Sequence, residues 1–336
     1  MNTKRIIALS LAIGLFLVSV LVSTAFNALT TDFSSAFETA VAPGGEEFTE
    51  KVEEEGNPAE KIVVLEVDGV IQDTSTTESF LSAPGYNHES FMKQLEQAQQ
   101  DNTVKGIVLD VNTPGGGVVE SAQIHDKIVE IQEATNKPVY VSMGSMAASG
   151  GYYISAPADK IYASPETMTG SLGVIMQSVN YEELADNIGI DFVTIKSGPH
   201  KDILSSSREM TEEEEKIVQS LIDNSYNGFV KVIADGRGLS EERVKQLADG
   251  RVYDGRQAKE LNLVDEFGYL EDTIEGLKKD AGLEGAQVVS YGASMGLPSF
   301  LTMKAGQLMG GNQELESIVK AFTQPNSPRL MYLYAE

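Results

Sequence analysis

The first patterned segment of the chain is an apolar run from Ile6 to Phe26 that contains no charged residue. About 20 apolar residues are enough to cross a bilayer as a helix. The alternative is a cleavable signal peptide, whose apolar region is usually only about 7–15 residues long. Because this run is longer and no small-x-small cleavage site follows it, a retained membrane anchor is the favoured interpretation.

Charge around the apolar run predicts its orientation. Lys4 and Arg5 precede the run, and acidic residues follow it. Basic residues accumulate on the cytoplasmic side of a membrane span. We therefore expect residues 1–26 to form a cytoplasmic stub and a single transmembrane helix in the cell membrane, with the rest of the chain extracellular.

Residues 27–60 show no apolar period and are acidic, with interspersed glycine and proline. Such a segment buries too little apolar surface to order itself, and its charges repel one another. The sequence predicts an acidic flexible linker over this range.

Beyond residue 60, apolar runs of strand length alternate with segments of helical period. The expected strands are 62–67, 106–111, 138–143, 160–163, 173–176, 192–195 and 287–290, and the expected helices include 91–98, 118–134, 181–187 and 211–235. Strands that alternate with helices are typical of an α/β fold with a mainly parallel sheet. We expect this domain to span residues 61–290 and a C-terminal extension to span 291–336.

Composition removes several classes of function. The chain has no cysteine, which excludes disulfides, thiolate metal sites and a cysteine nucleophile. It has three histidines, too few for a histidine-rich metal centre, so we expect neither a metal nor a cofactor. The formal net charge of −25 argues against a nucleic-acid partner, because phosphate binding requires a basic surface.

Two glycine-rich turns each lie between an expected strand and an expected helix. Residues 114–117 read Pro-Gly-Gly-Gly, and residues 147–151 read Ala-Ala-Ser-Gly-Gly. Sites in parallel α/β sheets form at the carboxyl ends of strands, where free backbone N–H groups can bind an anion or a developing oxyanion. The first turn lacks the Gly-Lys-Ser/Thr ending of a phosphate loop, and taken alone it is also explained as a tight turn.

Ser149 is the candidate nucleophile in the second turn. Its neighbours are too small to shield its hydroxyl, and the N–H groups beside it suit an oxyanion hole. The structural alternative is an N-cap serine. The surroundings do not match the G-x-S-x-G elbow of α/β-hydrolases.

The base that would activate Ser149 remains open on these grounds. Neither His88 nor His125 lies in a suggestive position, whereas His200 follows an expected strand but has no obvious acidic partner. A lysine can also serve as a base when burial lowers its pKa. Lys196 and Lys201 flank the same loop as His200, and the sequence pattern does not choose among the three residues.

Four segments in one order resemble bacterial signal peptide peptidase A, also called protease IV, in its short form from Gram-positive bacteria. They are residues 114–117, 144–153 (Gly-Ser-Met-Ala-Ala-Ser-Gly-Gly-Tyr-Tyr), 169–174 (Thr-Gly-Ser-Leu-Gly-Val) and 196–202 (Lys-Ser-Gly-Pro-His-Lys-Asp). The resemblance implies a crotonase/Clp-protease-like fold. It also implies Ser149 as nucleophile, Lys201 rather than Lys196 as general base, and Ser171 as the residue that orients the lysine. The implied oxyanion donors are Gly150 and either Gly115 or Gly116.

The resemblance further implies a serine endopeptidase that degrades remnant signal peptides after their release from preproteins. Its members assemble as ring-shaped homo-oligomers in which the serine and lysine of one site can come from neighbouring subunits. The expected partners are therefore signal peptides and other apolar peptide segments, membrane lipid around the N-terminal helix, and further copies of the chain.

The glycine turns are also compatible with two other functions. A crotonase-type acyl-CoA enzyme would share the fold but use paired carboxylates, and a non-catalytic membrane scaffold would use the glycine turns only for packing. The apolar tail at 328–334 is expected either to occupy a peptide cleft as product or pseudo-substrate, or to dock as a strand on a neighbouring subunit.

Overall fold

The computed structural model describes residues 48–73, 86–293 and 330–334. The expected transmembrane helix and most of the expected linker lie outside these ranges. Within the described ranges, no helix combines the length and the apolar character needed to span a bilayer.

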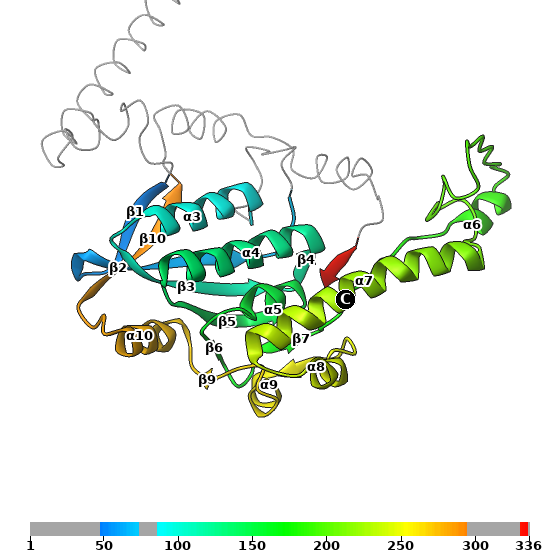
Figure 1. Cartoon of the computed structure of the whole chain (residues 1–336). Helices are drawn as coiled ribbons and strands as arrows, with labels where there is room; N and C mark the ends of the chain where they lie inside the picture. Colours follow the sequence, from blue (N-terminus) through cyan, green and yellow to red (C-terminus); the bar gives the residue numbers. More distant parts are fainter. Residues whose placement is uncertain (1–47, 74–85, 294–329, 335–336) are drawn as a thin grey trace, which may run out of the picture. The chain divides into compact units, whose positions relative to one another are not determined.

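A mainly parallel sheet forms the centre of the described structure (Figure 1). Its strand order is β1 (Phe48–Glu54), β10 (Ala286–Ala293), β2 (Asn57–Asp68), β3 (Val104–Thr113), β5 (Val139–Ala148), β6 (Lys160–Ala163) and β9 (Glu266–Phe267). Strand β7 (Met168–Gly170) pairs with β5 in parallel and with β8 (Val252–Asp254) in antiparallel orientation. The sheet confirms the prediction of an α/β fold with mainly parallel strands.

Helices cover both faces of this sheet (Figure 1). Helices α3 (His88–Gln100), α4 (Val118–Thr135) and α5 (Gly150–Ser155) lie over one face, and α10 (Leu270–Ala281) lies over the other. Under α10, Leu277 packs on Ile62, Val108 and Tyr140. Strands buried on both faces need apolar residues at successive positions, which explains why β2, β3 and β5 were visible as continuous apolar runs.

The predicted linker is wrong for residues 48–60, which belong to the folded domain as β1 and the start of β2. Their acidic residues have specific partners. Lys61 Nζ contacts Glu50 at 2.8 Å, and the buried amine of Lys278 contacts Glu54 at 2.7 Å. Charge that suggested a self-repelling tether is therefore balanced by lysines of the domain, one of them far away in the sequence.

Residues 176–221, here called the arm, differ most from the expected secondary structure. The segments 173–176 and 192–195 form no strands, although Ile175 makes an isolated bridge to Met331. The arm contains the short helix α6 (Glu182–Asn187) and the first part of α7 (Glu212–Arg237), which Figure 1 shows projecting away from the sheet. Val193 and Ile195 are 87% and 96% exposed, so apolar character here is not explained by burial within the chain.

The C-terminal half of α7 packs against the domain, and its residues Phe229 and Val230 are buried. Thr211 and Glu214 form a capping box at the start of α7, as expected for an N-cap threonine followed by acidic residues. The remaining helices are α8 (Glu241–Leu247) and α9 (Gly255–Glu260). A second, two-stranded sheet joins β4 (Gly115–Gly117) to β11 (Met331–Leu333).

Candidate active site

Ser149 lies between the end of β5 and the start of α5. Its backbone has φ 52° and ψ −112°, a conformation that a residue with a side chain rarely adopts. Its N–H donates to the carbonyl of Gly170 at 2.8 Å, which helps hold this geometry. Strained residues of this kind cluster at functional sites, where the surrounding structure maintains them.

The Ser149 hydroxyl is not used in the fold. The residue is 1% exposed, yet its Oγ has no hydrogen-bond partner among the described residues. Although Ser149 occupies the N-cap position of α5, its side chain makes no capping bond. This geometry contradicts the N-cap interpretation and leaves a buried hydroxyl that is available for chemistry.

The first glycine turn lies directly beside Ser149. Strand β4 is hydrogen-bonded to Ile71, whose N–H donates to Gly115 O and whose carbonyl accepts from Gly117 N. The N–H of Gly115 donates to Thr113 Oγ1 at 3.0 Å. Of the two glycines considered as oxyanion donors in this turn, Gly115 is therefore already engaged.

The C-terminal tail occupies the other side of β4. Strand β11 pairs antiparallel with it, Tyr332 opposite Gly116, and the N–H of Tyr334 donates to Pro114 O at 2.9 Å. Hydrogen-bonded pairs alternate along an antiparallel ladder, so Tyr332 and Gly116 form the other bonded pair. On its far side, Met331 exchanges two hydrogen bonds of 3.0 Å with Ile175. The tail is thus an extended strand held on both edges.

The carbonyl oxygen of Tyr332 lies against the backbone of both glycine turns. A Cβ atom on Gly115 would come within 2.1 Å of this oxygen and 2.6 Å of Gly150 N. A Cβ on Gly150 would lie 3.1 Å from both the same oxygen and Gly116 N. Only glycine leaves room for a carbonyl group here, and the two turns together form a cradle for it.

The Tyr332 side chain fills a buried aromatic pocket. Its ring is stacked on Tyr153 with centroids 4.8 Å apart and lies 4.6 Å from Phe229. Its hydroxyl donates to the carbonyl of Ser225 at 3.2 Å, and burial raises its pKa well above the ordinary tyrosine value. The residue is 2% exposed, so the pocket accommodates a large side chain almost completely.

Ser171 follows β7, next to the second glycine turn. Ala148 and Gly170 are partners in the β5–β7 ladder, so Ser149 and Ser171 are the residues that follow a paired position on adjacent strands. Ser171 has φ 50° and is 9% exposed, and its N–H donates to Arg251 O at 2.7 Å. The fold therefore brings these two predicted residues to the same region.

Lys201, in contrast, lies on the arm and does not meet Ser149 within hydrogen-bond distance in the same chain. Its side chain is exposed and has no hydrogen bond or ion pair among the described residues. Lys196 is paired with Asp202 at 2.6 Å, and the ring nitrogens of His200 lie 3.5–3.8 Å from Glu214 and Glu213. Of the three candidate bases, only Lys201 is free of a charged partner.

Sequence reasoning missed Ser121, which belongs to the first turn of α4. It is fully buried, and its Oγ has no hydrogen-bond partner among the described residues. This oxygen lies 2.7 Å from the position that a Gly150 Cβ would occupy. The aromatic pocket was also missed, because Tyr153 and Phe229 look like ordinary core residues in the sequence.

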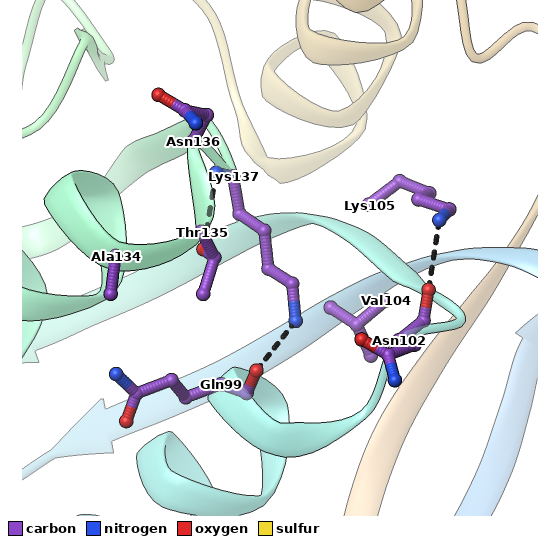
Figure 2. A pocket seen from close by; sticks show the side chains of 8 residues that line it. All are labelled: Gln99, Asn102, Val104, Lys105, Ala134, Thr135, Asn136 and Lys137. Carbon is purple, nitrogen blue, oxygen red and sulfur yellow. Dashed lines mark hydrogen bonds between the residues drawn. The ribbon is translucent and has the colours of Figure 1, made fainter.

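A hollow of about 410 Å³ lies at the opposite, amino-terminal edge of β3 and β5 (Figure 2). It is lined by Gln99, Asn102, Val104, Lys105, Ala134, Thr135, Asn136 and Lys137. The buried Lys137 Nζ donates to three backbone carbonyls at the end of α3, those of Ala98, Gln99 and Asp101. These bonds satisfy the amine of Lys137. Among the described residues, no cluster of three or more histidine or acidic side chains is arranged to hold a metal.

Comparisons with known proteins agree with a protease site. The model of peptidase family S49 matches residues 131–284. A protein of Enterococcus faecium named "Putative signal peptide peptidase SppA" is 40% identical over 99% of both chains. Protease 4 of Salmonella typhi is 37% identical over 63% of this chain and 33% of its own length. The chloroplastic serine protease SPPA of Arabidopsis thaliana is 27% identical over 79% of this chain and 39% of its own.

Proposed function

Because the chain belongs to peptidase family S49, we propose that it is a membrane-anchored serine endopeptidase that degrades remnant signal peptides with a Ser149–Lys201 dyad. One observation carries the proposal. The chain's own tail lies in the site as an extended peptide, with a carbonyl group held against Gly116 and Gly150 beside an unpartnered serine hydroxyl. A peptide substrate bound in the same way would have its scissile carbonyl at the nucleophile.

The proposed chemistry is acyl transfer to Ser149. Neutral Lys201 takes the hydroxyl proton as Ser149 Oγ attacks the carbonyl carbon, and the resulting lysine ammonium then protonates the leaving amine. The N–H groups of Gly116 and Gly150 would stabilise the tetrahedral oxyanion, since Gly116 pairs with Tyr332 and the Tyr332 carbonyl oxygen lies 3.1 Å from the position of an added Gly150 Cβ. Ser171 orients the lysine, and water hydrolyses the acyl-enzyme ester.

Lys201 is proposed to act on Ser149 of a neighbouring subunit. Within one chain its amine is exposed on the arm, away from any hydrogen bond to Ser149. The arm also exposes large apolar side chains, among them Ile188, Phe192 and Ile195. Large apolar side chains exposed in number on one segment are typical of surfaces that contact another protein. A ring-shaped homo-oligomer would bury these side chains and bring each lysine to the next serine.

The substrate class follows from the cleft and the proposed anchor. A strand-shaped binding site and an apolar aromatic pocket suit extended, apolar peptide segments. The Enterococcus faecium relative is named for signal peptides, and a single membrane span would keep the site close to the bilayer in which such peptides remain. The acidic surface, with net charge −25 for the chain, would also attract the basic end of a signal peptide.

The proposal is tested by hydrolysis of a synthetic signal peptide carrying a fluorophore and a quencher, with the full chain in detergent micelles. Ser149→Ala and Lys201→Ala are expected to abolish hydrolysis. Lys196→Ala is the comparison and should lose much less, because Lys196 is already paired with Asp202. Hydrolysis that survives Ser149→Ala would indicate another catalytic site, and absence of hydrolysis by the wild-type chain would support the non-catalytic scaffold. Hydrolysis that depends on Lys196 rather than Lys201 would reject the assigned base.

Sharing of the dyad between subunits has a separate test. The two inactive variants, Ser149→Ala and Lys201→Ala, are mixed after dissociation and allowed to reassemble. If one site uses residues of two subunits, some mixed sites contain both Ser149 and Lys201 and hydrolysis returns. A mixture that remains inactive, although light scattering shows mixed oligomers, would place the dyad within one chain.

A further inference from the structure

The loop that carries Lys201 is fastened to the start of α7 by one arginine. Arg208 Nε and Nη2 donate to the two carboxylate oxygens of Asp202, at 2.9 and 2.7 Å. Its Nη1 and Nη2 also donate to the two carboxylate oxygens of Glu214, at 2.8 and 2.6 Å. Two further bonds reach the carbonyls of Glu209 and Asp202. Paired, forked contacts of this type fix geometry better than single bonds do.

Both ends of this connection are themselves anchored. Glu214 is 1% exposed, and its carboxylate accepts from the N–H of Thr211 in the capping box of α7. Asp202 is the residue directly after Lys201, and its carboxylate also accepts from Lys196. The chain of contacts therefore runs from the rigid first turn of a 26-residue helix to the residue next to the proposed base.

The same contacts balance charges on the loop that carries Lys201. The charged and titratable side chains that contact one another here are Lys196, His200, Asp202, Arg208, Glu213 and Glu214, and the Glu182 carboxylate accepts from the N–H of Glu209. Hydrogen bonds from Arg208 lower the pKa of Asp202 below its usual range and that of Glu214 to about 2, so both carboxylates stay charged. Without the arginine, Lys196 would still pair with Asp202, but Glu214 would lose its arginine partner. The uncompensated negative charge would favour the protonated form of an amine on this loop.

We propose that Arg208 is the positioning residue for Lys201, holding the lysine loop on α7 and neutralising Asp202 and Glu214, the two carboxylates with which the arginine pairs. The inference rests on the proposed function of Lys201 as general base. Arg208 touches no substrate in this arrangement and acts through Asp202. It would serve two requirements of a lysine base together, a fixed location and surroundings that tolerate its neutral form.

The test measures pH profiles of kcat and KM for the full chain in detergent micelles, with the fluorogenic signal peptide. Arg208→Gln is expected to lower kcat by about 100-fold with little change in KM, because a small displacement of a catalytic group costs that much. The acid limb of the kcat profile should move to higher pH by about 0.5–1 unit. Arg208→Lys should recover part of kcat and return the acid limb most of the way to its wild-type pH. A lysine restores the positive charge but not the paired contacts of the guanidinium group.

A double variant separates charge from geometry. Adding Asp202→Asn to Arg208→Gln removes one uncompensated carboxylate, so the acid limb should return toward its original position while kcat stays low. The matched control is Arg256→Gln, which breaks an exposed arginine pair with Glu166 outside the site and should leave the profile unchanged. Circular dichroism and light scattering verify that each variant is folded and assembled.

The outcomes distinguish this inference from the proposed function. Activity that survives Lys201→Ala overturns the proposed function and the role of Arg208 with it. If Lys201→Ala is inactive but Arg208→Gln keeps the original kcat and acid limb, only the role of Arg208 is rejected. The role of Arg208 is also rejected if Arg208→Gln and Arg208→Lys lower kcat equally and neither moves the acid limb of the kcat profile. Loss of local structure alone predicts that result.

Discussion

The main chain of Tyr332 pairs with that of Gly116, so the last described strand of the protein lies along the glycine turn beside Gly150, the residue that follows the proposed nucleophile Ser149. Ladder contacts on both sides of the tail, to β4 and to Ile175, are those a peptide substrate would make. Under the proposed function, the tail is expected to compete with a peptide substrate at high effective concentration.

Removal of residues 330–336 should accelerate hydrolysis of an added peptide. The truncated chain no longer pairs β11 with β4, so we expect a lower KM with a similar kcat. Steady-state kinetics with the fluorogenic peptide measure both constants. A KM that is unchanged or higher would mean that the tail contributes to the cleft rather than competing for it.

Under the proposed function the Tyr332 carbonyl lies at the oxyanion position, so Tyr332–Leu333 is the bond that Ser149 would attack. We expect wild-type protein to lose residues 333–336, whereas Ser149→Ala and Lys201→Ala keep Glu336. Intact-mass spectrometry of the three purified proteins reads the C-terminus directly. Identical C-termini in all three would refute self-cleavage.

Gly150→Ala should lower kcat by about 100-fold or more, the loss typical for one oxyanion-hole donor. The added Cβ would lie 3.1 Å from the carbonyl position and 2.7 Å from Ser121 Oγ, which displaces the group that donates its N–H. Gly285→Ala is the control, because nothing lies within 4 Å of its added Cβ. Equal activity of the two variants would remove Gly150 from the oxyanion hole.

Asp110→Asn should stabilise the protein at neutral pH but not in acid. Burial, then the charges of Glu66, Asp68 and Glu271, raises the pKa of Asp110 to about 6. A carboxyl group whose pKa is higher in the folded state binds more protons there, so its contribution to stability falls as pH rises from about 4 to 6. Allowing for partial exposure, the loss is about 1–2 kcal/mol.

Thermal unfolding of Asp110→Asn should therefore show a higher Tm than wild type at pH 7.5 and a similar Tm at pH 4.5. Glu284→Gln, at an exposed position, should change neither value. If the Tm of Asp110→Asn differs from that of wild type by the same amount at both pH values, Asp110 does not titrate in this range.

Lys137→Met should destabilise the domain by about 2–4 kcal/mol, because three carbonyls at the end of α3 lose a charged donor inside the fold. Lys105→Met is a matched control from the same hollow, since the exposed Lys105 amine donates to a single carbonyl, that of Asn102. Urea denaturation compares the two variants. Equal losses would mean that the Lys137 bonds add little to stability.

The parts of the site that depend on local sequence could be predicted. Ser149 and the glycine turns follow apolar strands directly, and small residues beside a serine are visible without any knowledge of distant contacts. The same locality made the mainly parallel sheet predictable, because β2, β3 and β5 are continuous apolar runs.

The parts that depend on distant partners could not be predicted. Nothing near Glu54 indicates its ion pair with Lys278, so residues 48–60 resembled a linker. Nothing near Tyr153 indicates that its ring faces Tyr332 rather than the core. The apolar residues of the arm resembled a strand because a short apolar run looks the same in a sequence whether its side chains are buried or, like those of Val193 and Ile195, exposed.

The antiparallel pairing at β4 also limits what this cleft can accept. A peptide that forms a ladder with residues 115–117 must first give up any helical hydrogen bonds of its own, because the same N–H and C=O groups cannot serve both. Helical segments of folded proteins keep those groups engaged and would be excluded by their own secondary structure. Under the proposed function, this cleft would therefore distinguish helical from extended segments without reading their sequence.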